Sequence, residues 1–184
     1  LGMVAGYFRG RSDQFVSFMF FTLLSFPGLV LALLTVSAFG RSLWVVCLTL
    51  GVLAIAPVGR LARAATLVFA DREFVQASRV VGAKNFRIVS RELLPNVAIP
   101  MSALALLGMG VAIVAEGGLA FLGLSVEDQV SWGTIINDGR SIRDLQNNAW
   151  VALCPIGVMF LTILALNFAG DRVREYFDVR ETAF

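Results

Sequence analysis

Long uncharged stretches alternate with short charged ones along the chain, and this pattern predicts membrane-spanning helices. The uncharged stretches cover residues 15–39, 42–58, 97–115 and 149–170. Three of them are long enough to cross a hydrocarbon core of about 30 Å as a helix. The shortest lies between Arg41 and Arg60, whose long side chains can reach the interface. The expected fold is therefore an all-α, polytopic membrane helical bundle.

The first predicted span contains Pro27-Gly28 near its middle. A proline at this place removes a backbone hydrogen bond and bends or loosens the helix. Two interpretations stay open: a passive kink that neighbouring helices fill, or a hinge or pathway-facing bend at Phe26 and Pro27.

Residues 1–8 form an apolar run that is too short to cross a bilayer. Gly2 and Gly6 have the small-xxx-small spacing that permits a close contact with another helix. Because the chain opens inside this apolar run, we expect the N-terminal part of a longer protein to precede Leu1.

Residues 71–96, here called the elbow, form a charged, amphipathic island between two predicted spans. Asp71 can cap a helix that begins at Arg72, with Glu73 in the first turn, where the helix dipole favours an acidic side chain. Gly82 follows, and a left-handed glycine would end that helix. The expected apolar face of this first helix comprises Phe74, Ala77 and Val81.

A second helix of the elbow is expected to start with Asn85 as its cap. Pro95 and Pro100 would end it and allow a sharp turn into the next span. Its expected apolar face comprises Phe86, Val89 and Leu93. Spacing alone leaves two interpretations open: a glycine-broken pair of helices that receives a partner, or an amphipathic loop held on the lipid headgroups by its basic residues.

Glu116 lies in an otherwise apolar stretch, and an acid at membrane depth is a candidate functional residue by default. The alternative is a position near the outer interface, where Glu116 bonds backbone amides freed at Gly117-Gly118. Residues 127–146 then form a polar outer segment, in which Ser131-Trp132-Gly133 can act as an interfacial anchor. Pro155 and Asn167 are expected to interrupt the last span.

Composition narrows the class of protein further. The chain is 58% hydrophobic and 15% charged, with a mean hydropathy of +0.80, which excludes an ordinary soluble domain. Cys47 and Cys154 lie in apolar runs, so we expect small buried side chains and neither a disulfide nor a metal site. The absence of histidine excludes HExxH zinc chemistry. The nearest approach to a phosphate-binding loop, residues 81–84, lacks the upstream glycine and the Ser/Thr.

The basic residues predict the orientation of the chain in the membrane. With the elbow inside, 12 of the 15 Lys and Arg residues lie in inner segments, and Arg41, Arg140 and Arg143 lie outside. The reverse orientation would contradict the positive-inside bias. We therefore expect the elbow and the C-terminus on the cytoplasmic side of a multi-pass cell-membrane protein.

The elbow resembles the EAA loop of ABC importer permeases, whose pattern is EAA, three residues, Gly, a gap and Leu-Pro. Ala77, Gly82 and Leu94-Pro95 match that pattern, whereas Gln76 replaces the usual acid and Ser78 the second alanine. The resemblance implies that the first elbow helix docks into a cleft on a nucleotide-binding subunit. The implied ATPase-coupling residues are Glu73, Phe74, Gln76, Ala77, Ser78, Arg79, Gly82 and Ala83.

Further motifs resemble the C-type permease subunit of dipeptide/oligopeptide importers. They are AGYFRGRSDQF (residues 5–15), LLPN (93–96), EGGLAFLGLS (116–125), SWG (131–133) and LALNFAGDRVRE (164–175). The resemblance covers nearly all of residues 1–180, with Val179 in place of a proline common in that family. It implies a type I ABC importer permease fold, with one transmembrane domain over residues 1–184 and six helices in the whole protein.

The same resemblance implies a non-catalytic subunit of an ATP-driven importer of dipeptides or oligopeptides. The expected partners are a homologous B-type permease, two ABC ATPase subunits or domains, an extracytoplasmic substrate-binding protein and membrane lipid, with no nucleic acid. ATP and Mg would be bound by the ATPases, leaving no cofactor in this chain. Alternatives are import of nickel complexes, glutathione or haem. An ion-coupled secondary transporter would bury more titratable groups than Glu116 alone, and a structural scaffold leaves the elbow motif unexplained.

Overall fold

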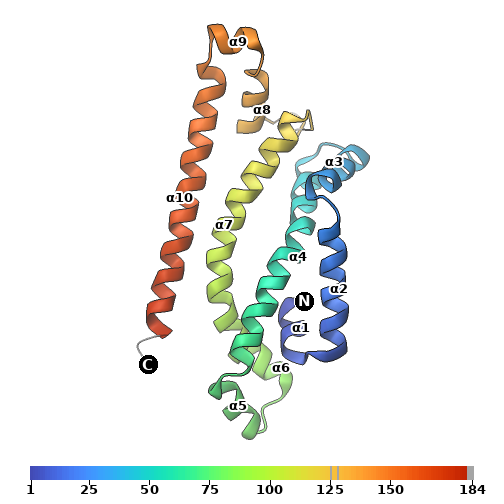
Figure 1. Cartoon of the computed structure of the whole chain (residues 1–184), viewed down its shortest axis with the longest axis vertical. Coiled ribbons are helices and arrows are strands. Elements are labelled where there is room, and N and C mark those ends of the chain that lie inside the picture. The colour runs from blue at the N-terminus through green and yellow to red at the C-terminus, as the bar shows by residue number, and fades with distance from the viewer. Residues whose placement is uncertain (125, 128, 182–184) are drawn as a thin grey trace. The chain divides into compact units, whose positions relative to one another are not determined.

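The computed structural model describes the backbone of residues 1–124, 126–127 and 129–181, and the side chains of these residues as far as Tyr176. Ser125, which closes the EGGLAFLGLS motif, and Asp128 of the outer segment lie outside the described residues. Every regular element in the described part is helical, which confirms the all-α fold (Figure 1). The helices are α1 (Gly2–Phe8), α2 (Gly10–Ser25), α3 (Gly28–Phe39), α4 (Leu43–Ala70), α5 (Glu73–Val80), α6 (Asn85–Arg87), a π-helix (Ile88–Leu93), α7 (Leu94–Phe121), α8 (Trp132–Asp138), α9 (Ile142–Asn147) and α10 (Trp150–Glu181).

Three helical stretches of the described part are long and apolar enough to cross a membrane. They are α4, the continuous run from α6 through α7, and α10 as far as Tyr176, with mean hydropathies of 2.0, 2.3 and 2.2. A fourth results if α2 and α3, separated at Phe26-Pro27, count as one broken span. At most 17% of the most apolar part of each long helix is buried, as expected for helices that are apolar all round and cross a membrane.

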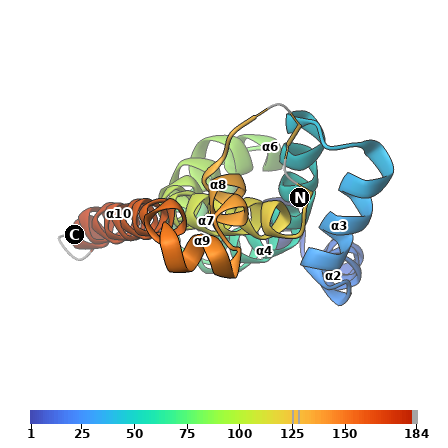
Figure 2. The same cartoon turned by 90° about the horizontal axis from the view of Figure 1, so that it is seen from above.

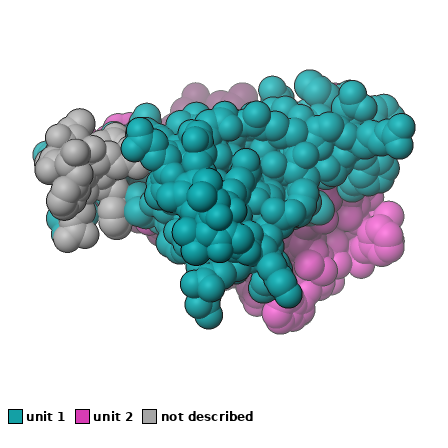
Figure 3. All heavy atoms as spheres, turned by 90° about the horizontal axis from the view of Figure 1, so that it is seen from below, with its two compact units in different colours: residues 1–25, 54–105, 170–184 teal, residues 26–53, 106–169 magenta. Residues whose placement is uncertain are grey.

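The chain forms two compact units, coloured separately in Figure 3. Unit 1 contains residues 1–25, 54–105 and the chain from residue 170 onward, and unit 2 contains residues 26–53 and 106–169. The elbow therefore belongs wholly to unit 1.

In unit 1, α1 packs closely on α4 through glycine. A Cβ atom on Gly2 would lie 2.1 Å from the Gly59 carbonyl oxygen, and one on Gly6 would lie 2.8 Å from that of Arg63. This confirms the close helix contact predicted from the small-xxx-small spacing. Gly59 in turn lies against the ring of Phe20 on α2, because a Cβ atom there would be 2.3 Å from that ring.

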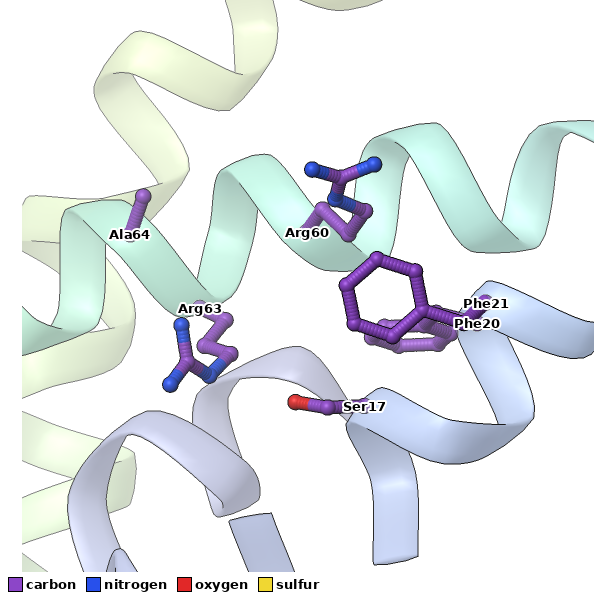
Figure 4. Close-up of a pocket in the computed structure, with 6 residues that line it drawn as sticks. All are labelled: Ser17, Phe20, Phe21, Arg60, Arg63 and Ala64. Atoms are coloured by element: carbon purple, nitrogen blue, oxygen red, sulfur yellow. The ribbon is translucent and has the colours of Figure 1, made fainter. Parts of the chain in front are cut away.

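A partly buried ion pair also joins α2 to α4. Arg63 donates from Nε and Nη2 to the carboxylate of Asp13, with 2.6 Å between Nη2 and Oδ2. A cavity of about 380 Å³ lies beside this pair and is shown in Figure 4. The guanidinium of Arg60 lies over the ring of Phe21, 5.3 Å from the ring centre. The cavity is lined by Ser17, Phe20, Phe21, Arg60, Arg63 and Ala64.

In unit 2, an apolar core joins α3, the start of α4 and the end of α7. Its buried members are Ala32, Val36, Val46 and Leu119. Figures 1 and 2 show α8 and α9 beside the C-terminal end of α7 and the N-terminal end of α10. The contact with α7 is close, because a Cβ atom on Gly133 would lie 2.7 Å from the Gly117 Cα atom. Ser131, from the SWG motif, caps α8 reciprocally with Thr134.

The prolines behave differently from the predictions in two of three places. Pro27 does interrupt the first apolar run, since α2 ends at Ser25 and α3 begins at Gly28. The expected end of the elbow helix at Pro95 and Pro100 is wrong, because α7 continues through both to Phe121. The expected interruption at Pro155 and Asn167 is also wrong, since α10 continues to Glu181. Each proline removes only one backbone hydrogen bond, and the remaining apolar turns keep the helix together.

Two further expectations are corrected. Cys47 and Cys154 are free but exposed on their helices, not buried, because an apolar residue of a membrane helix is as well suited to lipid as to protein. Glu116 is half-buried in a helix that continues through Gly117-Gly118 to Phe121. The backbone amides at these glycines are therefore part of the helix and are not freed for the Glu116 carboxylate.

Two glycines of α4 provide a test of this packing. We expect Gly59→Ala to lower the free energy of unfolding by about 1–3 kcal/mol, because the new methyl group would overlap the buried Phe20 ring. Gly51→Ala is the matched control: a methyl group there would have no neighbouring atom within 4 Å, so helix propensity alone should add about 0.5–1 kcal/mol. Unfolding of both variants in detergent micelles measures the difference, and equal effects would contradict the packing described.

Candidate functional site

The first elbow helix, α5, begins one residue later than expected. Arg72 is its N-cap and makes no side-chain capping bond, while Glu73 occupies the first turn as predicted. The prediction that Asp71 caps the helix is wrong. Its carboxylate instead accepts two hydrogen bonds from Nη2 of Arg9, at 2.8 and 2.7 Å. The charged side chain of Arg9, the C-cap residue of α1, is thus the partner of Asp71 in place of the amides at the start of α5.

The turn after α5 depends on Gly82, which has φ +84°. The Gly82 amide donates to the Arg79 carbonyl and the Ala83 amide to the Ser78 carbonyl, both at 3.0 Å. This is the Schellman arrangement that closes a helix with a left-handed residue. The predicted left-handed glycine is therefore confirmed.

The elbow has two arms: α5 before the Gly82 turn, and α6 with the π-helix after it. The second arm is not a separate helix. Lys84 is the N-cap of α6, and the side chain of Asn85 accepts a hydrogen bond from Tyr7 at 2.9 Å, so Asn85 is not the predicted cap. The single turn of α6 continues directly into the π-helix and α7. Leu94 donates to the carbonyl of Val89, five residues earlier, and this wider turn accommodates Pro95, which has no amide hydrogen and would crowd an α-helical turn.

A small apolar core fixes α5 against the π-helix and α1. Val75, Ile88 and Leu93 are each 0% exposed, and Tyr7 and Ala70 complete the cluster. The predicted apolar faces were therefore partly wrong. Val75, not Phe74 or Val81, is the residue of α5 that points inward, since the partners of α5 are helices of the same unit.

Several other apolar residues of the elbow face outward. Val80, Val81 and Phe86 are 88%, 87% and 84% exposed, and Phe74 is 36% exposed. We call these four residues the outer apolar residues of the elbow. Val80, Val81 and Phe86 lie close in sequence to the turn at Gly82, and Phe74 lies in the first turn of α5, so exposed apolar side chains lie next to the polar side chains of α5. Such a surface is typical of a contact with another protein or with a membrane.

The eight predicted coupling residues all lie on α5 or the turn that follows it, so the structure brings them together. Six are exposed: Glu73, Phe74, Gln76, Ala77, Arg79 and Gly82. Ser78 and Ala83 are half-buried. The side-chain nitrogen of Gln76 donates to the Asp71 carbonyl at 3.1 Å, which holds this residue beside the start of its own helix.

The other predicted candidates lie in unit 2, apart in sequence from the elbow. Phe26 is exposed at the break before α3, and Pro27 is the N-cap of α3. Within the part of the chain that the structure describes, the side chain of Glu116 makes no hydrogen bond or ion pair. The same part contains no cluster of three His, Cys, Asp or Glu side chains that could hold a metal ion. The predicted coupling residues of the elbow, in contrast, lie together on an exposed surface.

Sequence reasoning missed the residues of α1 that hold the elbow. Besides the bond from Tyr7 to Asn85, the guanidinium of Arg79 lies 5.2 Å from the centre of the Tyr7 ring. Both Tyr7 and Arg9 fall in the AGYFRGRSDQF motif, which carried a resemblance but no assigned role. This motif was the available signal that these residues matter. The neighbouring sequence of Tyr7 and Arg9 does not identify their partners, which lie more than 60 residues away.

Comparison with known proteins identifies the family. The model of the family described as "Binding-protein-dependent transport system inner membrane component" matches residues 1–182. The chain belongs to this family. It is 33% identical over 179 residues to the dipeptide transport system permease protein DppC of Alkalihalophilus pseudofirmus, a match that covers 97% of this chain and 58% of that protein.

Two other relatives carry different substrate names. The chain is 31% identical over 97% of its length to the glutathione transport system permease protein GsiD of Pectobacterium atrosepticum, covering 59% of that protein. It is 29% identical over 98% of its length to the oligopeptide transport system permease protein OppC of Haemophilus influenzae, covering 58% of that protein. The chain thus spans under three fifths of the length of these permeases.

The elbow core leads to a stability prediction. We expect Ile88→Ala to lower the free energy of unfolding by about 2–5 kcal/mol, because it leaves a cavity among Val75, Leu93 and Tyr7. Val81→Ala, at an exposed position of the same elbow, should change it by less than about 0.5 kcal/mol. Thermal unfolding in detergent, followed by circular dichroism, compares the two. Similar losses in both variants would show that the core does not hold the elbow.

Proposed function

We propose that this chain is a permease subunit of an ATP-driven importer of dipeptides or oligopeptides, and that its elbow receives force from an ATPase. The observation that carries the proposal is the two-sidedness of α5. One face is fixed by Val75 in a buried core, while Gln76, Ala77 and Arg79 are exposed beside the outer apolar residues. A helix held rigidly on one side and open on the other is suited to docking in a partner.

The family assignment supports the partners proposed for the assembled protein. A homologous B-type permease would supply the other half of the pathway, two ATPases would bind ATP and Mg, and an extracytoplasmic protein would deliver the substrate. The elbow and C-terminus would lie in the cytoplasm, as the distribution of Lys and Arg favours. The spans at residues 15–39, 42–58, 97–115 and 149–170 and the outer segment at 127–146 belong to the same proposal.

The mechanism follows from the continuity of the elbow with α7. Movement of α5 is passed to the π-helix through Val75 and Ile88, and from there directly into α7. Packed helices have discrete arrangements, so a small displacement at the elbow can switch the pathway between inward- and outward-facing states. The switch requires that the ATP-bound partners bind the two states with different free energies.

Variants of the elbow test this proposal. In the assembled complex, we expect Gly82→Val to abolish most peptide uptake, because a β-branched residue at φ +84° is strained and misdirects the turn. Gly82→Asn is the matched control, since asparagine tolerates a left-handed conformation and should retain most uptake. Uptake of labelled peptide at matched expression measures both.

Ala77→Asp tests the docking face itself, which is the exposed side of α5 with Gln76, Ala77 and Arg79. A new charge on this exposed face should reduce both uptake and the amount of ATPase that co-purifies, because the charge would be desolvated at the contact. Gln14→Asp adds the same charge at an exposed position of α2, outside the elbow. Normal uptake in both Ala77→Asp and Gly82→Val would remove the elbow from the mechanism.

Substrate identity has a second candidate, because one relative of similar identity is named for glutathione transport. Nickel complexes and haem are further cargoes of the same transport class. Competition between dipeptides, oligopeptides and glutathione in uptake assays separates these substrates. Purification of an active transporter that lacks any ATPase would instead favour an ion-coupled mechanism.

Glu116 gives a further prediction, in unit 2. Since this half-buried carboxylate has no partner in the described part of its own chain, we propose that its partner lies on another subunit. Glu116→Gln should therefore reduce recovery of the assembled complex more than it changes the relative uptake of different peptides. Size-exclusion chromatography and competition uptake are the two measurements. Full assembly with an altered peptide preference would contradict the proposal.

A further inference from the structure

We propose that Tyr7 is a positioning residue that holds both arms of the elbow on α1, so that displacement of the elbow is shared with the α1–α2 pair. The proposal rests on the proposed function of the elbow as a docking site, and it adds a transmission route through α1 to the one through the π-helix and α7.

The geometry around Tyr7 joins elements on both sides of the Gly82 turn. The Tyr7 hydroxyl donates to Oδ1 of Asn85 on α6 at 2.9 Å. The face of the same ring receives the guanidinium of Arg79 on α5, 5.2 Å from the ring centre, a cation–π contact. Tyr7 is 8% exposed and belongs to the elbow core. One side chain therefore contacts both arms at once.

The helix that carries Tyr7 is itself firmly held. Gly2 and Gly6 bring α1 against α4 at distances that leave no room for a methyl group. At the other end, Arg9 has φ +54°, a conformation that a non-glycine residue keeps only where surrounding contacts require it. The side chain of Arg9 donates two hydrogen bonds to Asp71, at the start of the elbow. A displacement of the elbow thus acts on a helix that contacts α4 and the start of the elbow.

The contacts of Tyr7 separate positioning from packing. Its ring fills part of the elbow core with Ala70, Val75, Ile88 and Leu93, whereas its hydroxyl makes only the bond to Asn85 among the contacts described. Tyr7→Phe keeps the ring, the core and the contact with Arg79 and removes the link to α6. Asn85 is exposed, so Asn85→Ala removes the same link without disturbing the core.

The test uses the complete complex in lipid vesicles and measures the number of peptide molecules imported per ATP hydrolysed. We expect Tyr7→Phe to lower this ratio by about two- to tenfold, the population shift that loss of one hydrogen bond produces. The ATPase should still co-purify, since Tyr7 lies beneath the docking face. Asn85→Ala should have the same effect, and the double variant should be no worse than either single variant.

Two further variants distinguish a positioning role from a structural one. Asn85→Asp keeps an acceptor for the Tyr7 hydroxyl, so this variant should have the same ratio of imported peptide to hydrolysed ATP as the unmodified protein. Ser90→Ala removes a hydroxyl of the π-helix that donates to the Phe86 carbonyl of α6, at 2.7 Å and only four residues away, and should leave the ratio unchanged.

The outcomes keep the two proposals apart. An unchanged ratio in both Tyr7→Phe and Asn85→Ala would overturn the role of Tyr7 while leaving the elbow as the docking site. A loss in Asn85→Asp or Ser90→Ala as large as that in Tyr7→Phe would show a general disturbance and overturn it too. Absence of any ATPase from the purified unmodified complex would instead overturn the proposed function, and the role of Tyr7 with it.

Discussion

The burial of Val75, Ile88 and Leu93 against one another is the interaction on which the rest of the elbow depends. The three side chains come from α5 and the π-helix, and each is fully removed from solvent. Burial of such side chains contributes about 1.5–3 kcal/mol each, which exceeds the contribution expected from the exposed pair of Arg9 and Asp71. The apolar core therefore fixes α5, and the polar contacts adjust its position. Without this core, the predicted coupling residues would have no defined face.

Two backbone features turn this core into a connected structure. The left-handed Gly82 reverses the chain so that α5 can lie back on the π-helix. The π-helix then accommodates Pro95 without a break, and the elbow leads directly into the long apolar helix α7. A flexible loop at either place would absorb a displacement, whereas a continuous helix passes it on. The same local sequence, with its glycine and prolines, thus combines a sharp turn with a rigid connection.

The α1–α2 pair is held to the rest of unit 1 by contacts of three physical kinds. Close glycine packing sets the distance between α1 and α4, where no side chain separates the backbones. The partly buried pair of Asp13 and Arg63 joins α2 to α4, and breaking it would leave a charge poorly solvated. Tyr7 adds contacts to both arms of the elbow. Steric, ionic and hydrogen-bonding constraints therefore converge on a short stretch at the start of the chain.

The sequence by itself determined the features that depend on a residue and its immediate neighbours. These include the apolar helices, the interruption at Pro27, the left-handed turn at Gly82 and the close packing at Gly2 and Gly6. Only the tertiary structure decided which apolar residues of the elbow are buried, and that Asp71 and Asn85 bond to Arg9 and Tyr7, 62 and 78 residues away, and not to their own helix ends. The physical reason is that backbone preference and hydropathy act locally, whereas the partner of a polar or apolar side chain depends on which distant helix the fold brings beside it.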